Sequence, residues 1–263
     1  MNIVVCIKQV PNTNDVKLDP VTGTLKREGI PSIINPDDKR AIEAALKLKD
    51  EYGAHVTVMT MGLPQADLAL KEAVAMGADE AILITDRVFA GSDTWATSSV
   101  LAAAVKKLPF DIIFTGRQAI DGDTAQVGPQ IAEHLGLPSV SYAEEIKLEE
   151  GAVTVKRKFE DRYHLIRVKT PCLITALSEL NTPRYMTPGR IFDAFNAPEL
   201  ATKVWTNSDL GMDPETVGLK GSPTKVLKSF NKAVKPAGEK YKPESPEAAA
   251  ALIVEKLQEK FIL

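Results

Sequence analysis

The sequence predicts an α/β fold built on a doubly wound, mainly parallel sheet, and three observations support this prediction. Five short runs of apolar and β-branched residues alternate with stretches whose apolar residues have helical spacing. The runs are almost continuously apolar, as in strands that are buried on both faces. Alternating strands and helices are typical of parallel sheets, and ligands of such sheets lie outside the carboxyl ends of the strands.

The expected elements follow one another along the first part of the chain. The five strands are Asn2–Lys8, His55–Met61, Glu80–Thr85, Asp111–Thr115 and Pro171–Leu177. Helical spacing predicts helices over Asp37–Glu51, Gln65–Met76, Thr94–Lys107 and Thr124–Leu135. The last of these is followed by Gly136 and Pro138, which are typical helix stop signals.

Two insertions and a long arm depart from this alternation. Val16–Ile30 could form a small hairpin, and the alternating apolar and charged residues of Glu144–Lys169 predict an antiparallel meander. After Thr187 the pattern is lost, and only Glu247–Phe261 regains helical spacing. We therefore expect an α/β domain over residues 1–186 and a C-terminal arm over 187–263. The apolar stripe of the terminal helix either binds a partner or packs back on its own domain.

Composition narrows the class of protein. The chain has 263 residues, of which 44% are hydrophobic and 25% charged, so it can bury a substantial core. With a net charge of −3, the chain has no excess of positive charge that would attract the phosphate backbone of a nucleic acid. No stretch of about 18 apolar residues suggests a membrane helix, and no secretory signal is recognisable. We therefore expect a cytoplasmic protein that neither binds nucleic acid nor inserts into a membrane.

Side-chain catalysis has no support in the sequence. No Ser/His/Asp arrangement or metal-ligand spacing is present, and Cys6 and Cys172 lie in apolar runs typical of small buried residues. The segment after the first strand, Lys8–Asn14, contains no glycine, so the nicotinamide-dinucleotide fingerprint is absent. Any redox chemistry must therefore belong to a bound cofactor.

The most informative segment is a polar loop that joins the strand ending at Thr115 to the next predicted helix. Such a loop directs unpaired backbone N–H groups and the positive end of a helix dipole outward, which suits a phosphate. Asp121 and Asp123 would repel phosphate, so we expect them to point toward ribose hydroxyls or loop amides, leaving Thr124 and Gln126 for the phosphates. The alternative is an ordinary turn in which Asp121 or Asp123 caps the helix.

The loop Gly-Arg-Gln-Ala-Ile-Asp-Gly-Asp-Thr-Ala-Gln-Val at 116–127 closely resembles the adenine-nucleotide loop of the β (small) subunit of electron-transfer flavoproteins. Four further motifs extend the resemblance over nearly the whole chain. These are Ile3–Pro11, Ile34–Pro36, Ala75–Asp79 and Leu180–Tyr185. The resemblance implies a fold like that of adenine-nucleotide α-hydrolases without hydrolytic activity, a heterodimer with an α subunit, and bound AMP or, in electron-bifurcating members, a second FAD.

Matching positions one by one gives the residues that the resemblance implies for the cofactor site. Outside the main loop they are Cys6, Asn35, Asp38 and Met61, for which core packing or helix capping are the alternatives. In the main loop they are Gly116, Arg117, Gln118, Ala119, Ile120, Asp121, Gly122, Asp123, Thr124, Ala125, Gln126 and Val127.

A second loop separates two branches of the family. The segment containing Phe89, Gly91, Ser92, Asp93 and Thr94 resembles that of bifurcating members from anaerobic bacteria. This implies an FAD that accepts hydride from NADH and passes electrons to ferredoxin or flavodoxin and to an acyl-CoA dehydrogenase. The alternative is a helix cap formed by Ser92 or Asp93.

Two alternatives to bifurcation stay open. One is a simple electron carrier that holds AMP, and the other is an adenylating enzyme of the ATP-pyrophosphatase kind. The chain also departs from the family at Pro188, where members that serve several dehydrogenases carry an anchoring Leu. Whether a dehydrogenase docks at this position is therefore an open question.

Overall fold

The computed structural model describes residues 1–12, 31–227 and 237–263. The contacts divide the chain into two units, Met1–Lys228 and Ser229–Leu263. This division falls later than the boundary at 186/187 that the sequence suggested. The expected hairpin at Val16–Ile30 lies outside the described residues.

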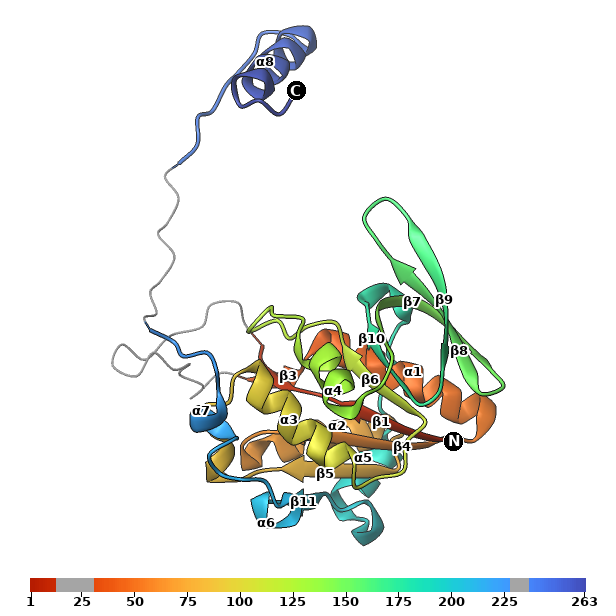
Figure 1. Cartoon of the computed structure of the whole chain (residues 1–263). Helices are drawn as coiled ribbons and strands as arrows, with labels where there is room; N and C mark the ends of the chain where they lie inside the picture. The colour runs from red at the N-terminus through yellow and green to blue at the C-terminus, as the bar shows by residue number, and fades with distance from the viewer. Residues whose placement is uncertain (13–30, 228–236) are drawn as a thin grey trace. The chain divides into compact units, whose positions relative to one another are not determined.

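The first unit is an α/β structure whose strands form one large sheet and one small one (Figure 1). Its strands are β1 (Asn2–Cys6), β2 (Gln9–Pro11), β3 (Ser32–Ile34), β4 (His55–Met61), β5 (Glu80–Ile84), β6 (Ile112–Gly116), β7 (Ser139–Glu149), β8 (Ala152–Lys158), β9 (Tyr163–Lys169), β10 (Cys172–Ala176) and β11 (Lys203–Trp205). Its helices are α1 (Pro36–Tyr52), α2 (Asp67–Met76), α3 (Thr94–Val105), α4 (Val127–Leu135), α5 (Pro188–Asn196), α6 (Asn207–Leu210) and α7 (Gly218–Gly221).

The strand order of the large sheet is β11-β5-β4-β1-β6-β10-β7-β8-β9, and β2 pairs with β3 in the small antiparallel sheet. From β1 the chain moves outward through β4 to β5, and then returns to place β6 on the other side of β1. These three pairings are all parallel. The order thus reverses between β1 and β6, which confirms the predicted doubly wound fold and locates its topological switch point.

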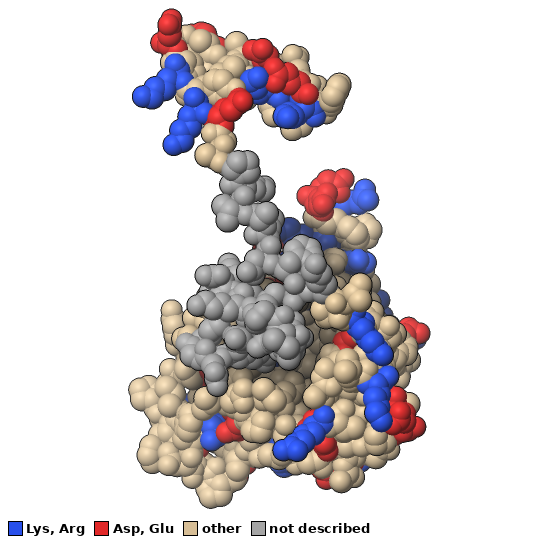
Figure 2. Space-filling view, turned by 90° about the vertical axis from the view of Figure 1, so that its left-hand side faces the viewer, with Lys and Arg blue, Asp and Glu red and all other residues tan. Residues whose placement is uncertain are grey.

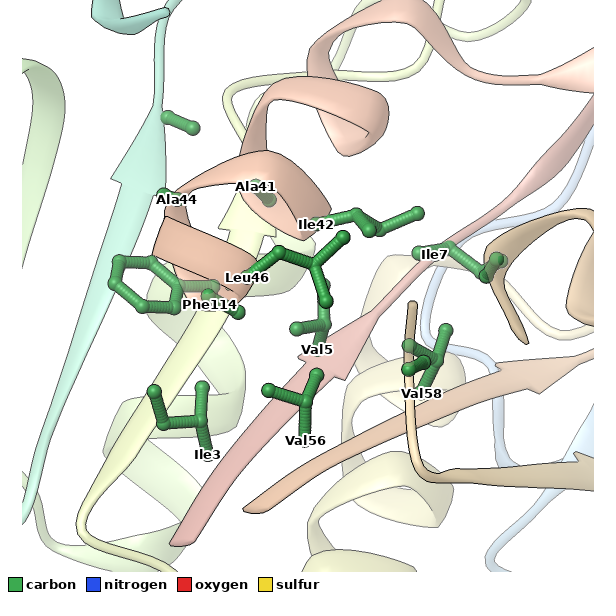
Figure 3. Packing of buried hydrophobic residues seen from close by; sticks show 14 of the residues in the cluster. Ile3, Val5, Ile7, Ala41, Ile42, Ala44, Leu46, Val56, Val58 and Phe114 are labelled. Carbon is green, nitrogen blue, oxygen red and sulfur yellow. The ribbon is translucent and has the colours of Figure 1, made fainter. Parts of the chain in front are cut away.

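Helices cover both faces of this sheet. The buried residues of α1 and α2 belong to one core cluster, and those of α3 and α4 belong to a second cluster on the opposite face. In the first cluster, Ile42 and Leu46 of α1 lie over Val5 of β1 and Phe114 of β6 (Figure 3). All four side chains are fully buried. Burial of each contributes roughly 1.5–3 kcal/mol, so the faces of β1 and β6 are rigidly held.

The predicted meander is a continuation of the main sheet. The start of β7 pairs in parallel with β10, while the rest of β7 pairs antiparallel with β8, and β8 pairs antiparallel with β9. The meander is visible in Figure 1 as the green strands that extend from the body of the first unit.

Between Thr187 and the terminal helix, where the sequence pattern is lost, the structure has further regular elements. α5 packs on α2 with Ala194 buried, and β11 pairs in parallel with β5, which adds an edge strand to the sheet. β11 has only three residues, over which no period can be read. α5 has nine residues, and its amphipathic spacing was overlooked.

The described part of the second unit contains α8 (Pro246–Glu259), whose first turn is capped by Ser245 accepting a hydrogen bond from the backbone N–H of Ala248. No residue of α8 is buried, and Ile253 and Val254 are exposed. None of the helices in the described ranges is long and apolar enough to span a bilayer.

Candidate functional site

The carboxyl ends of β1, β4 and β6 meet at one edge of the sheet, at Cys6, Met61 and Gly116. The chain leaves β1 toward one face and β6 toward the other, and a crevice between the two following segments is where doubly wound sheets bind ligands. Figure 2 shows the side of the molecule toward which β1 runs, and most of the side chains visible there outside the grey part are uncharged.

Asp38 bridges the ends of the two strands. Its Oδ2 accepts a hydrogen bond from the backbone N–H of Lys8 at 2.8 Å, and its Oδ1 accepts one from the backbone N–H of Gly116 at 3.0 Å. The carboxyl group is buried, and this burial raises its pKa to about 7, although the two backbone N–H groups and the Asn35 side chain act in the opposite direction. A Cβ at position 116 would lie 2.3 Å from Oδ1, so only glycine fits there.

Asn35 ties α1 to the main loop. Its Nδ2 donates to the carbonyl of Gln118 at 2.8 Å, and its Oδ1 accepts from the backbone N–H of Ile120 at 3.1 Å. Although Asn35 occupies the N-cap position of α1, its side chain makes no capping hydrogen bond. The side chain therefore shapes the loop instead of capping the helix.

The ammonium group of Lys8 links the segment after β1 to the main loop. Its Nζ lies 2.6 Å from Oδ1 of Asp121, whose side chain is only 8% exposed. Asp123 is engaged within the loop, where its Oδ1 accepts a hydrogen bond from Nε2 of Gln118 at 3.0 Å. Arg117 turns toward α1, with its Nε 3.5 Å from Oδ2 of Asp37. The two loop aspartates thus already have donors in the protein.

The end of the loop forms a concave run of backbone N–H groups. Asp123 and Ala125 have φ angles of 49° and 52°, in the left-handed region, and Gln126 follows with a right-handed conformation. Alternation of this kind makes successive N–H groups point into one concavity, which suits an anion. Within the described ranges, no hydrogen bond reaches the backbone N–H groups of 124–128. We call residues 123–128 the amide cradle.

The predicted start of α4 at Thr124 was wrong, because the helix begins at Val127. The left-handed residues Asp123 and Ala125 are incompatible with a right-handed helix, so the first helical turn forms only after them. Gly128 lies where a Cβ would come within 2.5 Å of Oγ1 of Thr115. The glycine therefore lets the first turn of α4 approach β6 closely.

The second loop meets the cradle through a side-chain hydrogen bond. Oγ1 of Thr94 donates to Oε1 of Gln126 at 3.1 Å. Asp93 caps α3 by accepting from the backbone N–H of Ala96, and its other carboxylate oxygen accepts from both the backbone N–H and the hydroxyl of Thr224. The cap that the sequence offered as an alternative for Asp93 is therefore present.

The other residues of this loop face the protein. Phe89 is buried in the second core cluster, and Oγ of Ser92 donates to the carbonyl of Phe89. Gly91 has a φ of 75°, and a Cβ on it would lie 3.1 Å from Cβ of Leu219. Close packing against α7 is thus one sufficient reason for glycine at this position.

The remaining expected site residues lie at the ends of β1 and β4 and in the main loop. Cys6 is buried, and its thiol has a pKa raised to about 12 by burial, so it carries no charge near neutrality. Met61 is partly buried and packs against the same core cluster as Cys6. Gly122 has open space around it and can carry a side chain.

Sequence reasoning missed two contributors to this site. Lys8 supplies both a backbone N–H for Asp38 and an ammonium group for Asp121, and Gly128 allows α4 to approach β6. The role of Lys8 could have been suspected from its position directly after the first strand. The motif Leu180–Tyr185 has a structural role: Asn181 and Arg40 exchange hydrogen bonds, and Arg184 binds Glu43 in α1.

Comparison with known proteins agrees with this arrangement. The family model described as electron transfer flavoprotein domain matches residues 22–202. The chain is 59% identical over 259 residues, 98% of each chain, to "Electron transfer flavoprotein subunit beta" from Clostridium acetobutylicum. The chain belongs to the electron transfer flavoprotein family.

Two further relatives carry names that refer to reductase complexes. "Caffeyl-CoA reductase-Etf complex subunit CarD" from Acetobacterium woodii is 53% identical over 265 residues, covering 100% of each chain. "Acryloyl-CoA reductase electron transfer subunit gamma" from Anaerotignum propionicum is 49% identical over 269 residues, again covering 100% of each. The resemblance drawn from the loop at 116–127 is confirmed, and the chain has the electron-transfer role of a β subunit.

Proposed function

We propose that this chain binds FAD through its adenylate half, as the β subunit of a heterodimer with an electron-transfer flavoprotein α subunit. The amide cradle carries this proposal, because residues 124–128 offer successive backbone N–H groups at the start of α4. A cradle of this kind binds phosphate without a nearby cationic side chain. The adenosine would then extend along the crevice toward the ends of β1 and β4.

We further propose that the heterodimer is electron-bifurcating. When bound at this site, FAD supplies a ring that takes hydride from NADH and releases electrons singly. The acceptors would be ferredoxin or flavodoxin and, through the α subunit, an acyl-CoA dehydrogenase. Support comes from the relatives named as parts of caffeyl-CoA and acryloyl-CoA reductase systems.

An AMP-holding carrier is the second candidate, and one observation favours it. The loop expected to distinguish the branches uses Asp93, Ser92 and Gly91 for contacts within the protein, so these residues do not require a flavin beside them. The amide cradle would hold the phosphate of AMP equally well. The two candidates differ in ligand content and in reactivity with NADH, not in the cradle.

The α subunit is expected to be needed for the complete site. The described part of the second unit presents an apolar groove of about 400 Å³, lined by Tyr241, Pro243, Ala249, Leu252, Ile253, Lys256 and Leu257. An exposed apolar surface of this kind is typical of a protein interface. Produced alone, the chain should be poorly soluble or poor in flavin, and a monodisperse monomer with stoichiometric FAD would contradict this expectation.

The test is to produce the chain together with its α subunit, extract the bound nucleotides and record the visible spectrum before and after NADH. Two FAD per heterodimer, no AMP and rapid bleaching by NADH support bifurcation. One FAD, one AMP and no reaction with NADH place the protein in the carrier branch. A heterodimer whose β subunit contributes no nucleotide would overturn both candidates.

A further inference from the structure

Asp38 has an unusual position among the polar residues of the first unit. It lies in the first turn of α1, and its two carboxylate oxygens accept backbone N–H groups from two different strand ends, Lys8 after β1 and Gly116 at the end of β6. These strands pair up to Cys6 and Thr115, and the chain then leaves them toward opposite faces. A single carboxyl group thus spans the point where the crevice opens.

Both contacts are strongest in the ionised form. A carboxylate offers acceptors only, and it accepts from both N–H groups at once. The protonated acid is a weaker acceptor and carries a hydrogen on one oxygen. Protonation therefore weakens the hold of Asp38 on at least one of the two strand ends.

The surroundings of Asp38 bring this change into the neutral range. Burial raises its pKa to about 7, and the nearby charge of Asp37 acts in the same direction. The other charged groups at this edge are already paired, Arg117 with Asp37 and Lys8 with Asp121. The Cys6 thiol on β1, with its raised pKa, stays neutral.

We propose that Asp38 is a positioning residue that sets the width of the nucleotide crevice, and that its protonation opens the strand ends and weakens nucleotide binding. The proposal rests on the proposed nucleotide-binding function. Asp38 acts through the loops that follow β1 and β6, and its own oxygens are occupied by Lys8 and Gly116. Nucleotide affinity therefore falls as the pH drops through neutrality.

The experiment uses the full chain in complex with its α subunit, freed of nucleotide, and ADP-ribose as the probe. The two phosphates of ADP-ribose are diesters, whereas AMP is unsuitable because a phosphate monoester itself titrates near pH ~6. Affinity is measured from about pH 5.5 to 8.5 in the wild type, in Asp38→Asn and in Asp37→Asn, the matched control on the neighbouring carboxylate. We expect the wild type and Asp37→Asn both to lose roughly tenfold in affinity toward acid, the equivalent of one hydrogen bond to a charged group. In Asp37→Asn the loss should occur at lower pH, because the charge of Asp37 raises the pKa of Asp38.

Asp38→Asn should bind with a low affinity that does not change over this range. A wild type that binds equally at all pH values, or an Asp38→Asn variant that keeps the full acid-side loss, overturns the role of Asp38. If the wild type binds ADP-ribose at no pH, the nucleotide site itself has failed. If Asp38→Asn does not fold, the backbone amide chemical shifts of the wild type test the proposal instead. The shifts of Lys8 and Gly116 should change together with pH near neutrality. Shifts that do not change with pH would contradict the proposal.

Discussion

The ammonium group of Lys8 lies 2.6 Å from Oδ1 of Asp121, a residue 113 positions later in the chain. The lysine is 45% exposed and the aspartate 8%, so the pair neutralises a shielded carboxylate at the edge of the proposed phosphate site. Without this cation, the charge of Asp121 would act directly on an anionic ligand.

Replacing Lys8 should therefore weaken nucleotide binding by repulsion. We expect Lys8→Met to lower affinity for ADP-ribose roughly threefold to tenfold, a modest effect because the lysine is partly hydrated. Adding Asp121→Asn should restore most of the loss, since it removes the repelling charge. Calorimetric titration of the two variants checks this, and a double variant as weak as Lys8→Met would contradict the electrostatic account.

Gly128 should be intolerant of a side chain, whereas Gly122 should accept one. A Cβ on Gly128 would lie 2.5 Å from Oγ1 of Thr115, but nothing lies within 4 Å of a Cβ on Gly122. Gly128→Ala should displace the first turn of α4, lower the free energy of unfolding by about 1–3 kcal/mol and reduce nucleotide binding. Gly122→Ala is the matched control and should leave both nearly unchanged; equal effects would show that the close approach of α4 does not matter.

Asp38 should make the stability of the first unit depend on pH. Its pKa is about 7 in the native state. Its pKa in the unfolded chain is about 3.9, so the native state binds the proton more tightly. Between these values the free energy of unfolding therefore falls as the pH rises, and the fall ends above the native pKa. Urea denaturation at several pH values should show this decline in the wild type and not in Asp38→Asn; parallel curves would contradict it.

Arg184 should matter more for stability than other surface cations. It donates to both oxygens of Glu43, whose side chain is 5% exposed, and to Oδ2 of Asp50. Arg184→Met leaves Glu43 buried without its partner, so we expect a loss of about 1–3 kcal/mol, discounted because the arginine is partly exposed. Lys158→Met, which breaks an exposed pair with Glu179, should have a much smaller effect because solvent screens that pair. Denaturant titration of the two variants measures the difference.

Asp93 should hold the segment that leads out of the first unit. Asp93→Ala removes the cap of α3 and both hydrogen bonds to Thr224, so it should cost about 0.5–2 kcal/mol and speed tryptic cleavage after the exposed Lys225. Ser92→Ala is the control, because that hydroxyl reaches only the neighbouring carbonyl of Phe89. Cleavage at Lys225 no faster in Asp93→Ala than in Ser92→Ala would show that Thr224 is held by other contacts.

The sequence predicted the elements with long and regular patterns. The buried strands β1, β4, β5, β6 and β10 were expected because they are continuous apolar runs, and the helices α1 to α4 because they carry apolar residues at helical spacing. The short elements β11, α6 and α7 were missed, since their stability comes from packing on the first unit and not from their own pattern.

Within the candidate site, residue types were more predictable than backbone conformations. Asn35, Asp38 and the loop at 116–127 do come together at the ends of β1 and β6. The left-handed conformations of Asp123 and Ala125 carried no local signal, because neither residue is glycine. The late start of α4 and the amide cradle follow from these two conformations and could be found only in the structure.

Left-handed backbone at Asp123 and Ala125 has a consequence for the protein before it meets a ligand. Such conformations in residues other than glycine cost on the order of 1 kcal/mol each and persist only when their surroundings hold them. Since no hydrogen bond within the described ranges reaches the N–H groups of 124–128, residues 123–128 are expected to be among the first parts of the first unit to open in local unfolding. Amide hydrogen exchange in the ligand-free chain would then be fastest at these residues. A bound phosphate would stabilise the folded conformation of this segment and slow the exchange.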